Sequence, residues 1–390
     1  MSWIELQIDR ANRALWYLCA MIIRGITRVR KQQVFLWSYR FNQYACNPRY
    51  LSEYILDNTN GWDVYWAFNK DYDTSAVDRR IKIVRYPSFS YLFAMYSSKY
   101  VITNLRNDRF GTFFKKKHNQ KYLMLWHGST PLKRIEKDAE FELGPQYVKR
   151  GIDDSSMCDL MISNCDFFTD ILQRAFWYNG EILKCGLPRN SVFFDKSFVS
   201  KSREDLNNYC RFDKDSLVVL YAPTFRNGSN SLDPYRMRWD QIIPTLEKTF
   251  KKRVSVFIRL HPNLIGLDLS SLLEDADIKD VTRYPDMQSL LCAADILITD
   301  YSSSMFDFSI FKKPCFLYTP DLDKYNRGFY FMFSELPYPL ARNEGELCEL
   351  ISCFNTSLYL EKLKTFMEES IGMKEDGNGS EMIFRWMVNN

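Results

Sequence analysis

The sequence predicts an α/β protein with two domains, each built on a parallel sheet, and a basic helix in front of them. Short apolar runs of about five residues alternate with helical stretches along most of the chain, a pattern typical of parallel sheets with crossover helices. The runs form two series separated by a charged stretch, and 390 residues are enough for about two to three domains. With 46% apolar and 26% charged residues, the composition is that of an ordinary globular protein and excludes a disordered chain.

The first element is a helix expected within residues 1–33. Its apolar run, residues 14–23, stands between Arg13 and Arg24 and has about half the length that a membrane-spanning helix needs. Residues 1–31 carry six bases and two acids, which accounts for the whole net charge of +4. With Trp3 before the run and Trp16 within it, the pattern favours a helix lying in the headgroup layer of an anionic membrane. The alternative is a first helix that packs on its own domain.

The first series of runs predicts a domain over residues 34–190. A helix is expected at 91–98. The strands are expected at 34–37, 64–68, 81–84, 100–103, 122–126 and 160–163.

The second series predicts a domain over residues 191–390, with a final helix from Ser380 that returns to the cleft. Helices are expected at 239–251, 287–293 and 304–311, and strands at 216–221, 254–260, 295–299 and 314–317. Two doubly wound domains of this kind face one another across a cleft, and ligands bind at the carboxyl ends of the strands. Polar residues that directly follow the strands are therefore the site candidates.

His127 follows the strand at 122–126 and is the first of these candidates. Gly128 permits a tight turn, while Ser129 and Thr130 are placed to cap a helix that Pro131 opens. An imidazole at this position suits a general base. The alternative is a histidine that only bonds a neighbouring backbone group.

His261 follows the strand at 254–260 in the same way, with Arg259 two positions before it. Such an imidazole can hydrogen-bond a diphosphate and, as a cation, help to neutralise a departing phosphate. The alternative is an ordinary turn histidine before Pro262.

Two further strand ends carry groups suited to phosphate. Asp300, Ser302 and Ser303 stand between the strand at 295–299 and the next helix, where free N–H groups and the helix dipole attract phosphate oxygens. Thr224 and Arg226 follow the strand at 216–221, and arginine offers a planar fork of donors. Simple helix capping by serine is the alternative at 302–303.

Several chemistries have no visible residue pattern. The three histidines and ten cysteines include no C-x-x-C pair or ligand cluster, so no metal site is predicted. No cofactor is certain, and Mg²⁺ stays open as an aid to charge neutralisation without a dedicated carboxylate pair. The small net charge argues against a nucleic-acid partner. No secretory signal is recognisable, and the scattered cysteines indicate a reduced, cytosolic setting.

Taken in order, the motifs resemble the CDP-glycerol glycerophosphotransferase family of teichoic-acid primases and polymerases. The resemblance spans roughly residues 34–385. It rests on Trp-His-Gly-Ser-Thr-Pro-Leu-Lys at 126–133, Gly-Leu-Pro-Arg-Asn at 186–190, Tyr-Ala-Pro-Thr-Phe-Arg at 221–226, Arg-Leu-His-Pro at 259–262, Thr-Asp-Tyr-Ser-Ser at 299–303 and Asp-Gly-Asn-Gly-Ser at 376–380.

The resemblance implies a GT-B-like pair of Rossmann-type domains, with the acceptor in the first and the CDP donor in the second. The implied reaction moves glycerol phosphate from CDP-glycerol to a hydroxyl of a lipid-linked acceptor, with release of CMP, at the cytoplasmic face of the cell membrane. His127 then matches the base and His261 the histidine at the donor diphosphate. The other matches are donor contacts at Thr224, Arg226, Arg259, Asp300, Ser302 and Ser303, and donor or acceptor contacts at Gly128, Ser129, Thr130, Asp376 and Ser380.

Three alternatives remain open at this point. Ser129 is an insertion relative to the common Trp-His-Gly-Thr-Pro motif, so CDP-ribitol and ribitol phosphate stand beside CDP-glycerol. The same fold also serves glycosyltransferases that use nucleotide sugars. The third alternative is a non-catalytic binding subunit attached to the membrane.

Overall fold

The structure is a computed structural model that describes residues 3–226, 232–261, 264, 272, 278–325 and 328–390. Met1 and Ser2 of the predicted first helix, and Pro262 of the Arg-Leu-His-Pro motif, lie outside this part. The chain forms two compact units. Unit 1 comprises Met1–His127, Ile135–Ser191 and Lys374–Asn390, and unit 2 comprises Gly128–Arg134 and Val192–Met373.

Unit 1 is built on a seven-stranded parallel sheet of order β3-β2-β1-β4-β5-β6-β7. The order 3-2-1-4-5-6 is that of the Rossmann fold. The strands are β1 (Arg30–Trp37), β2 (Asp63–Asn69), β3 (Lys82–Tyr86), β4 (Ser98–Thr103), β5 (Lys121–Met124), β6 (Leu160–Ser163) and β7 (Glu181–Lys184). The helices are α1 (Trp3–Ile26), α2 (Cys46–Asn58), α3 (Phe89–Ser97), α4 (Arg109–Thr112), α5 (Pro145–Met157), α6 (Asp166–Ala175) and α13 (Gly379–Asn389).

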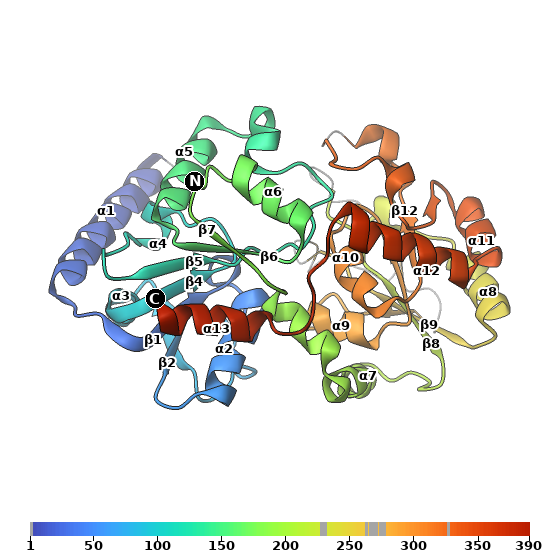
Figure 1. Cartoon of the computed structure of the whole chain (residues 1–390), viewed down its shortest axis with the longest axis horizontal. Helices are drawn as coiled ribbons and strands as arrows, with labels where there is room; N and C mark the ends of the chain where they lie inside the picture. Colours follow the sequence, from blue (N-terminus) through green and yellow to red (C-terminus); the bar gives the residue numbers. More distant parts are fainter. Residues whose placement is uncertain (1–2, 227–231, 262–263, 265–271, 273–277, 326–327) are drawn as a thin grey trace. The chain divides into compact units, whose positions relative to one another are not determined.

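The sequence explains the unit 1 elements locally. Strands β4 and β6 are buried almost throughout and mostly apolar, as a sheet covered on both faces requires. Ser88 caps α3 by accepting a hydrogen bond from the Tyr91 N–H at 3.1 Å. The last helix, α13, lies beside α2 (Figure 1) and places Ile383 and Met387 in the core of this unit.

Unit 2 has a six-stranded parallel sheet of order β10-β9-β8-β11-β12-β13. Its strands are β8 (Leu217–Tyr221), β9 (Val254–Ile258), β10 (Ile278–Asp280), β11 (Ile296–Thr299), β12 (Cys315–Tyr318) and β13 (Leu340–Ala341). Its helices are α7 (Lys196–Tyr209), α8 (Trp239–Phe250), α9 (Met287–Ala293), α10 (Ser304–Phe308), α11 (Glu344–Ser352) and α12 (Thr356–Thr365).

Short helical turns join these elements. The 3₁₀ turns are η1 (Tyr39–Phe41), η2 (Glu136–Glu142), η3 (Pro188–Phe194), η4 (Asp233–Tyr235), η7 (Ser309–Phe311), η8 (Leu322–Lys324) and η9 (Phe333–Glu335), and η10 (Phe366–Ser370) is a π turn. The helix predicted over 304–311 is α-helical only in α10 and tightens to 3₁₀ in η7. The prediction of two α/β domains with parallel sheets is confirmed.

Candidate active site

His127 stands at the end of the extension of β5 in unit 1. Leu125 continues the ladder through its N–H to the Thr103 carbonyl at 2.8 Å, and Trp126 then turns the chain with a left-handed φ of 51°. The Nδ1 atom of His127 lies 3.2 Å from the Asn104 carbonyl oxygen at the end of β4. The ring centroid is 4.4 Å from that of Trp126.

The His127 ring is a neutral base at pH 7. Its pKa is lowered from 6.5 to about 4, mainly by burial, with a smaller lowering from the positive charge of Arg189, while the hydrogen bond with Asn104 acts in the opposite direction. The Arg189 guanidinium also donates to the His127 carbonyl. A neutral imidazole can accept a proton from an alcohol, which is the role expected from the sequence.

The residues after His127 depart from the sequence prediction. Gly128, Ser129 and Thr130 belong to unit 2, and no helix begins at Pro131. The segment instead pairs with residues 328–330, through the Arg134 N–H to the Gly328 carbonyl at 2.8 Å and the Tyr330 N–H to the Leu132 carbonyl at 2.9 Å. Backbone pairing of the Gly128–Arg134 segment therefore takes the place of the predicted helix.

Ser129 and Thr130 are both buried in unit 2. The Ser129 hydroxyl has no hydrogen-bond partner within the described residues. A buried hydroxyl in this state costs free energy unless a ligand or water satisfies it.

In unit 2, the strand ends of β8 and β11 bring Thr224, Arg226 and Asp300 together. The Thr224 N–H donates to Asp300 at 2.9 Å, and the Arg226 guanidinium lies 2.7 Å from the Asp300 carboxylate. Arg226 also makes a two-bonded pair with Asp321, at 2.6 and 3.1 Å, and lies 4.9 Å from the ring centroid of Tyr301. The positive charge of Arg226 is thus balanced by the carboxylates of Asp300 and Asp321. These ion pairs hold the loops after β8 and β11 together.

The sequence analysis missed Asp321, which pairs with Arg226 across 95 residues. The local sequence Asp321-Leu-Asp323 does not indicate an ion pair with a distant residue. Only the proximity of the β12 end to the β8 end, which follows from the sheet order, could have pointed to it.

His261 and Arg259 follow β9. Removal from bulk water lowers the pKa of His261, and the positive charge of Lys133 lowers it further. The His261 ring centroid is 5.4 Å from that of Phe225. Arg259 donates to the Tyr284 carbonyl at 2.7 Å, so part of its donor fork holds the loop after β10.

Ser302 and Ser303 lie between β11 and α10. The Ser302 hydroxyl is 2.8 Å from that of Ser304, whereas the Ser303 side chain makes no capping bond to α10. The strand–loop–helix arrangement predicted at this position is present. Asp300 is buried beneath the loop and accepts from the Tyr301 N–H at 2.5 Å.

Asp376 and Ser380 belong to unit 1 and surround the start of α13. Asp376 accepts from the Asn378 N–H at 2.9 Å, and the buried Ser380 hydroxyl has no partner within the described residues. Next to them, Glu375 accepts from the Leu187 N–H at 3.1 Å and from the Asn190 side chain at 2.9 Å. The sequence analysis missed Glu375, which links the Asp-Gly-Asn-Gly-Ser motif to the Gly-Leu-Pro-Arg-Asn motif.

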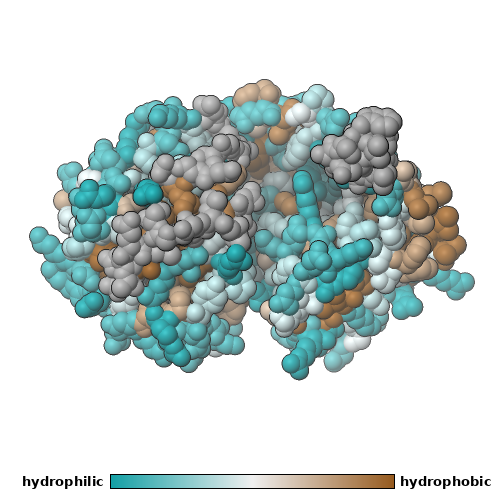
Figure 2. All heavy atoms as spheres, turned by 180° about the vertical axis from the view of Figure 1, so that it is seen from behind, coloured by the Kyte–Doolittle hydropathy of each residue, from teal (hydrophilic) through white to brown (hydrophobic). Residues whose placement is uncertain are grey.

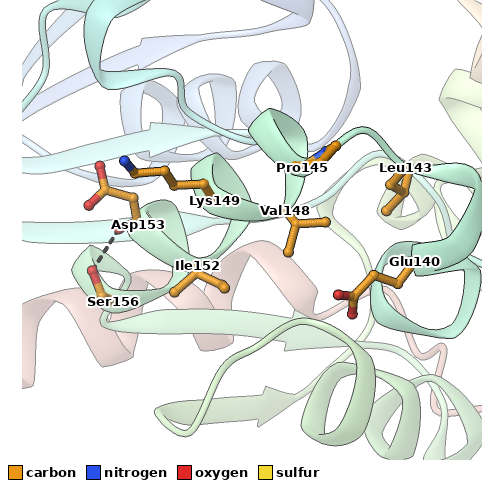
Figure 3. Close-up of a pocket in the computed structure, with 8 residues that line it drawn as sticks. All are labelled: Glu140, Leu143, Pro145, Val148, Lys149, Ile152, Asp153 and Ser156. Atoms are coloured by element: carbon orange, nitrogen blue, oxygen red, sulfur yellow. Dashed lines mark hydrogen bonds between the residues drawn. The ribbon is translucent and has the colours of Figure 1, made fainter.

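Two open hollows on the surface contain no sequence-predicted site residue. One of about 640 Å³ lies in unit 1 between η2 and α5 and has an apolar floor that includes Leu143, Val148 and Ile152 (Figure 3). The other, of about 680 Å³, lies in unit 2 and includes Arg134, Arg342 and Phe329. Across the described residues, no group of three His, Cys, Asp or Glu side chains could hold a metal ion.

The comparison with known proteins decides the family. Residues 19–389 match the family described as CDP-Glycerol:Poly(glycerophosphate) glycerophosphotransferase. The chain belongs to this family. The resemblance predicted from the ordered motifs is therefore confirmed.

The chain is similar to named members of this family along most of its length. It is 31% identical over 344 residues to the teichoic acid poly(glycerol phosphate) polymerase of Bacillus subtilis (strain 168), covering 85% of this chain and 45% of that protein. It is 29% identical over 367 residues to the teichoic acid glycerol-phosphate transferase of Staphylococcus aureus (strain NCTC 8325 / PS 47), covering 90% and 92%. The chain spans about half the length of the two polymerases it matches from B. subtilis and Staphylococcus epidermidis.

The fold is that of a solved family member. A variant of the wall teichoic acid polymerase TagF, soaked with CDPG, superposes with a TM-score of 0.79 at 25% identity and covers 98% of each chain. This likeness confirms the predicted architecture of two Rossmann-type domains.

Proposed function

We propose that the protein transfers glycerol phosphate from CDP-glycerol to a hydroxyl of a lipid-linked acceptor and releases CMP, in the synthesis of a teichoic-acid or capsule-like polymer. The observation that carries this proposal is the neutral His127 at a strand end, in a chain of the glycerophosphotransferase family. Two relatives of matching length are a teichoic acid glycerol-phosphate transferase and a teichoic acid poly(glycerol phosphate) polymerase.

In this reaction His127 accepts the proton of the acceptor hydroxyl. The oxygen attacks the phosphorus that bears glycerol, the bond from that phosphorus to the bridging oxygen breaks, and CMP leaves. Because the transition state spreads negative charge over phosphoryl oxygens, hydrogen-bond donors and cations stabilise it. In unit 2, His261, Thr224, Ser302, Ser303 and backbone N–H groups of the same loops are the proposed donors, while Arg226 and Arg259 hold those loops in place.

The assay is CMP release from CDP-glycerol and from CDP-ribitol, with and without a lipid-linked acceptor, beside UDP-sugar controls. We expect acceptor-dependent CMP release that falls at least about 100-fold in His127→Ala, with donor binding retained by calorimetry. His118→Ala is the matched control, because His118 is an exposed histidine in the same unit. Release of UDP alone would identify a glycosyltransferase, and full turnover in His127→Ala would remove His127 as the base.

We also propose that α1 holds the enzyme at the cytoplasmic face of an anionic membrane. One face of α1 packs on unit 1 through Ala20 and Ile23, which are buried. The opposite face bears Leu15, Leu18, Ile22 and Ile26, which are 56% to 68% exposed. At about 100° per residue these four side chains share one side of the helix.

Charge and neighbouring side chains support the same surface. Arg10 and Arg13 on α1, and Arg28 two residues beyond its end, are exposed, whereas Arg24 donates to the Lys115 carbonyl at 3.0 Å and so helps to dock the helix. Phe89 on α3 is 58% exposed and lies against Trp16 of α1. Figure 2 shows the hydrophobic patch at its right edge, over α1. No helix in the described part of the chain is long and apolar enough to span a bilayer.

Vesicle flotation tests this membrane proposal. Leu18→Glu should lower binding to vesicles with about 30% anionic lipid at least several-fold, because it places a charge in the apolar face. Leu358→Glu is the matched control, since Leu358 is 50% exposed on α12 in unit 2. Equal flotation of wild type and both variants would contradict the role of α1.

A further inference from the structure

We infer that Arg189 and the carbonyl of Asn104 are positioning groups for His127. The Asn104 carbonyl determines which ring nitrogen accepts the proton, and Arg189 holds the backbone turn that carries the ring. Their link to catalysis rests on the proposed function. The geometry itself does not, because every contact lies within unit 1.

The Asn104 carbonyl selects one tautomer of His127. A carbonyl oxygen can only accept a hydrogen bond, so the Nδ1 atom at 3.2 Å carries the hydrogen and Nε2 carries the lone pair. Asn104 is held in turn, because its side-chain oxygen accepts from the Tyr39 N–H at 3.1 Å. Nε2 is therefore the atom that takes up the proton of the acceptor hydroxyl.

The backbone that carries the ring needs support. Trp126 has a φ of 51°, a left-handed conformation that is unfavourable for a large side chain and persists only where surrounding contacts enforce it. The Asn47 side-chain amide donates to the Leu125 carbonyl at 2.9 Å and to the Trp126 carbonyl at 3.1 Å. Arg189 donates to the next carbonyl, that of His127.

Asn47 and Arg189 form one clamp on these three successive carbonyls. The backbone N–H of Arg189 donates to the Asn47 side-chain oxygen at 3.2 Å, and both residues are buried. A planar guanidinium reaches the carbonyl in a fixed geometry that an ammonium group does not reproduce. The same guanidinium charge disfavours protonation of the ring.

Nitrogen NMR of the full-length protein with ¹⁵N-labelled histidine tests the tautomer directly. The chain has three histidines, so the spectrum is simple, and His118→Ala and His261→Ala assign it. We expect His127 to carry its hydrogen on Nδ1 at pH 7. A hydrogen on Nε2 would overturn the inference.

Arg189→Gln tests the clamp, with Arg85→Gln as its matched control. Arg85 also donates from unit 1 to a backbone carbonyl, that of Tyr72 at 2.8 Å, near the other edge of the sheet. In Arg189→Gln the pKa of His127 should rise, and kcat should fall by about 10- to 100-fold with KM for CDP-glycerol within about twofold. Arg85→Gln should change neither quantity.

Arg189→Lys separates charge from geometry and guards against a Gln variant that fails to fold. It should keep the pKa of His127 low and still lose about 10-fold in kcat. An unchanged pKa and kcat in Arg189→Gln, or the same changes in Arg85→Gln, would overturn the inference. The NMR readouts need no substrate, so an expected tautomer in a chain that is inactive with every CDP donor would refute the proposed function alone.

Discussion

Replacing Gly379 with alanine should destabilise unit 1 by steric conflict alone. A Cβ atom at Gly379 would lie 1.9 Å from the Gly186 carbonyl oxygen and 2.5 Å from its carbon. These are backbone atoms, which cannot rotate away as a side chain can. Gly379 does not have a left-handed φ, so alanine carries no torsional penalty there, and the clash is the whole effect.

The size of the effect follows from what holds the two backbones together. Relief of the clash requires the start of α13 to move away from Gly186 by more than about 1 Å, while Ile383 and Met387 fix the helix in the core. Overpacking of this kind costs about 3 kcal/mol, which corresponds to a Tm lower by about 6–12 °C for a domain of this size.

Thermal unfolding followed by circular dichroism measures this loss. Gly144→Ala is the control, because nothing lies within 4 Å of a Cβ placed at Gly144, and its Tm should stay within about 2 °C of wild type. A Tm for Gly379→Ala within the same 2 °C would refute the reasoning. It would show that α13 does not hold the Asp-Gly-Asn-Gly-Ser motif against Gly186.

Two further predictions concern buried charges in unit 1. The pKa of His127 is about 4 in the native chain, against an ordinary value of 6.5. Between these pH values the imidazole is protonated in the unfolded chain but not in the native chain. The free energy of unfolding therefore falls by about 3 kcal/mol as the pH drops through that range. In urea unfolding at pH 7 and pH 4.5, the difference between the two midpoints should be smaller for His127→Gln than for wild type. An equal difference in both proteins would contradict this prediction. Arg106→Met should cost about 3–5 kcal/mol in urea unfolding at pH 7, since it leaves the buried Glu136 and Asp154 without their shared guanidinium; a loss under about 1 kcal/mol would contradict this.

The sequence predicted the strands correctly where a short apolar run is also buried in the structure. The strand predicted at 295–299 is present and buried as β11, and Asp300 directly follows it, as the sequence indicated. His127 was found in the same way after β5. Because ligands bind at the carboxyl ends of the strands in this topology, candidate site residues can be named without coordinates, and their roles as ligand contacts stay predictions.

The partners of these groups could not be read from the sequence, because they come from distant parts of the chain. Arg189 reaches the His127 carbonyl across 62 residues, and Glu375 reaches Leu187 across 188. The helix expected at Pro131 failed for a related reason. Local capping residues were present, but backbone pairing with residues 328–330 offered the segment other hydrogen bonds.

The path of the chain explains why His127, the proposed base, needs a clamp of its own. His127 is the last residue of unit 1 before the chain enters unit 2 at Gly128, and Leu132 and Arg134 are already hydrogen-bonded to the 328–330 loop of that unit. The ring of His127 is therefore attached to a backbone whose next segment is hydrogen-bonded within unit 2. The bonds from Asn47 and Arg189 to three carbonyls in a row hold residues 125–127 to unit 1. With the backbone held there, the Asn104 carbonyl can fix the ring, so the orientation of Nε2 is determined by unit 1 even though the next residue belongs to unit 2.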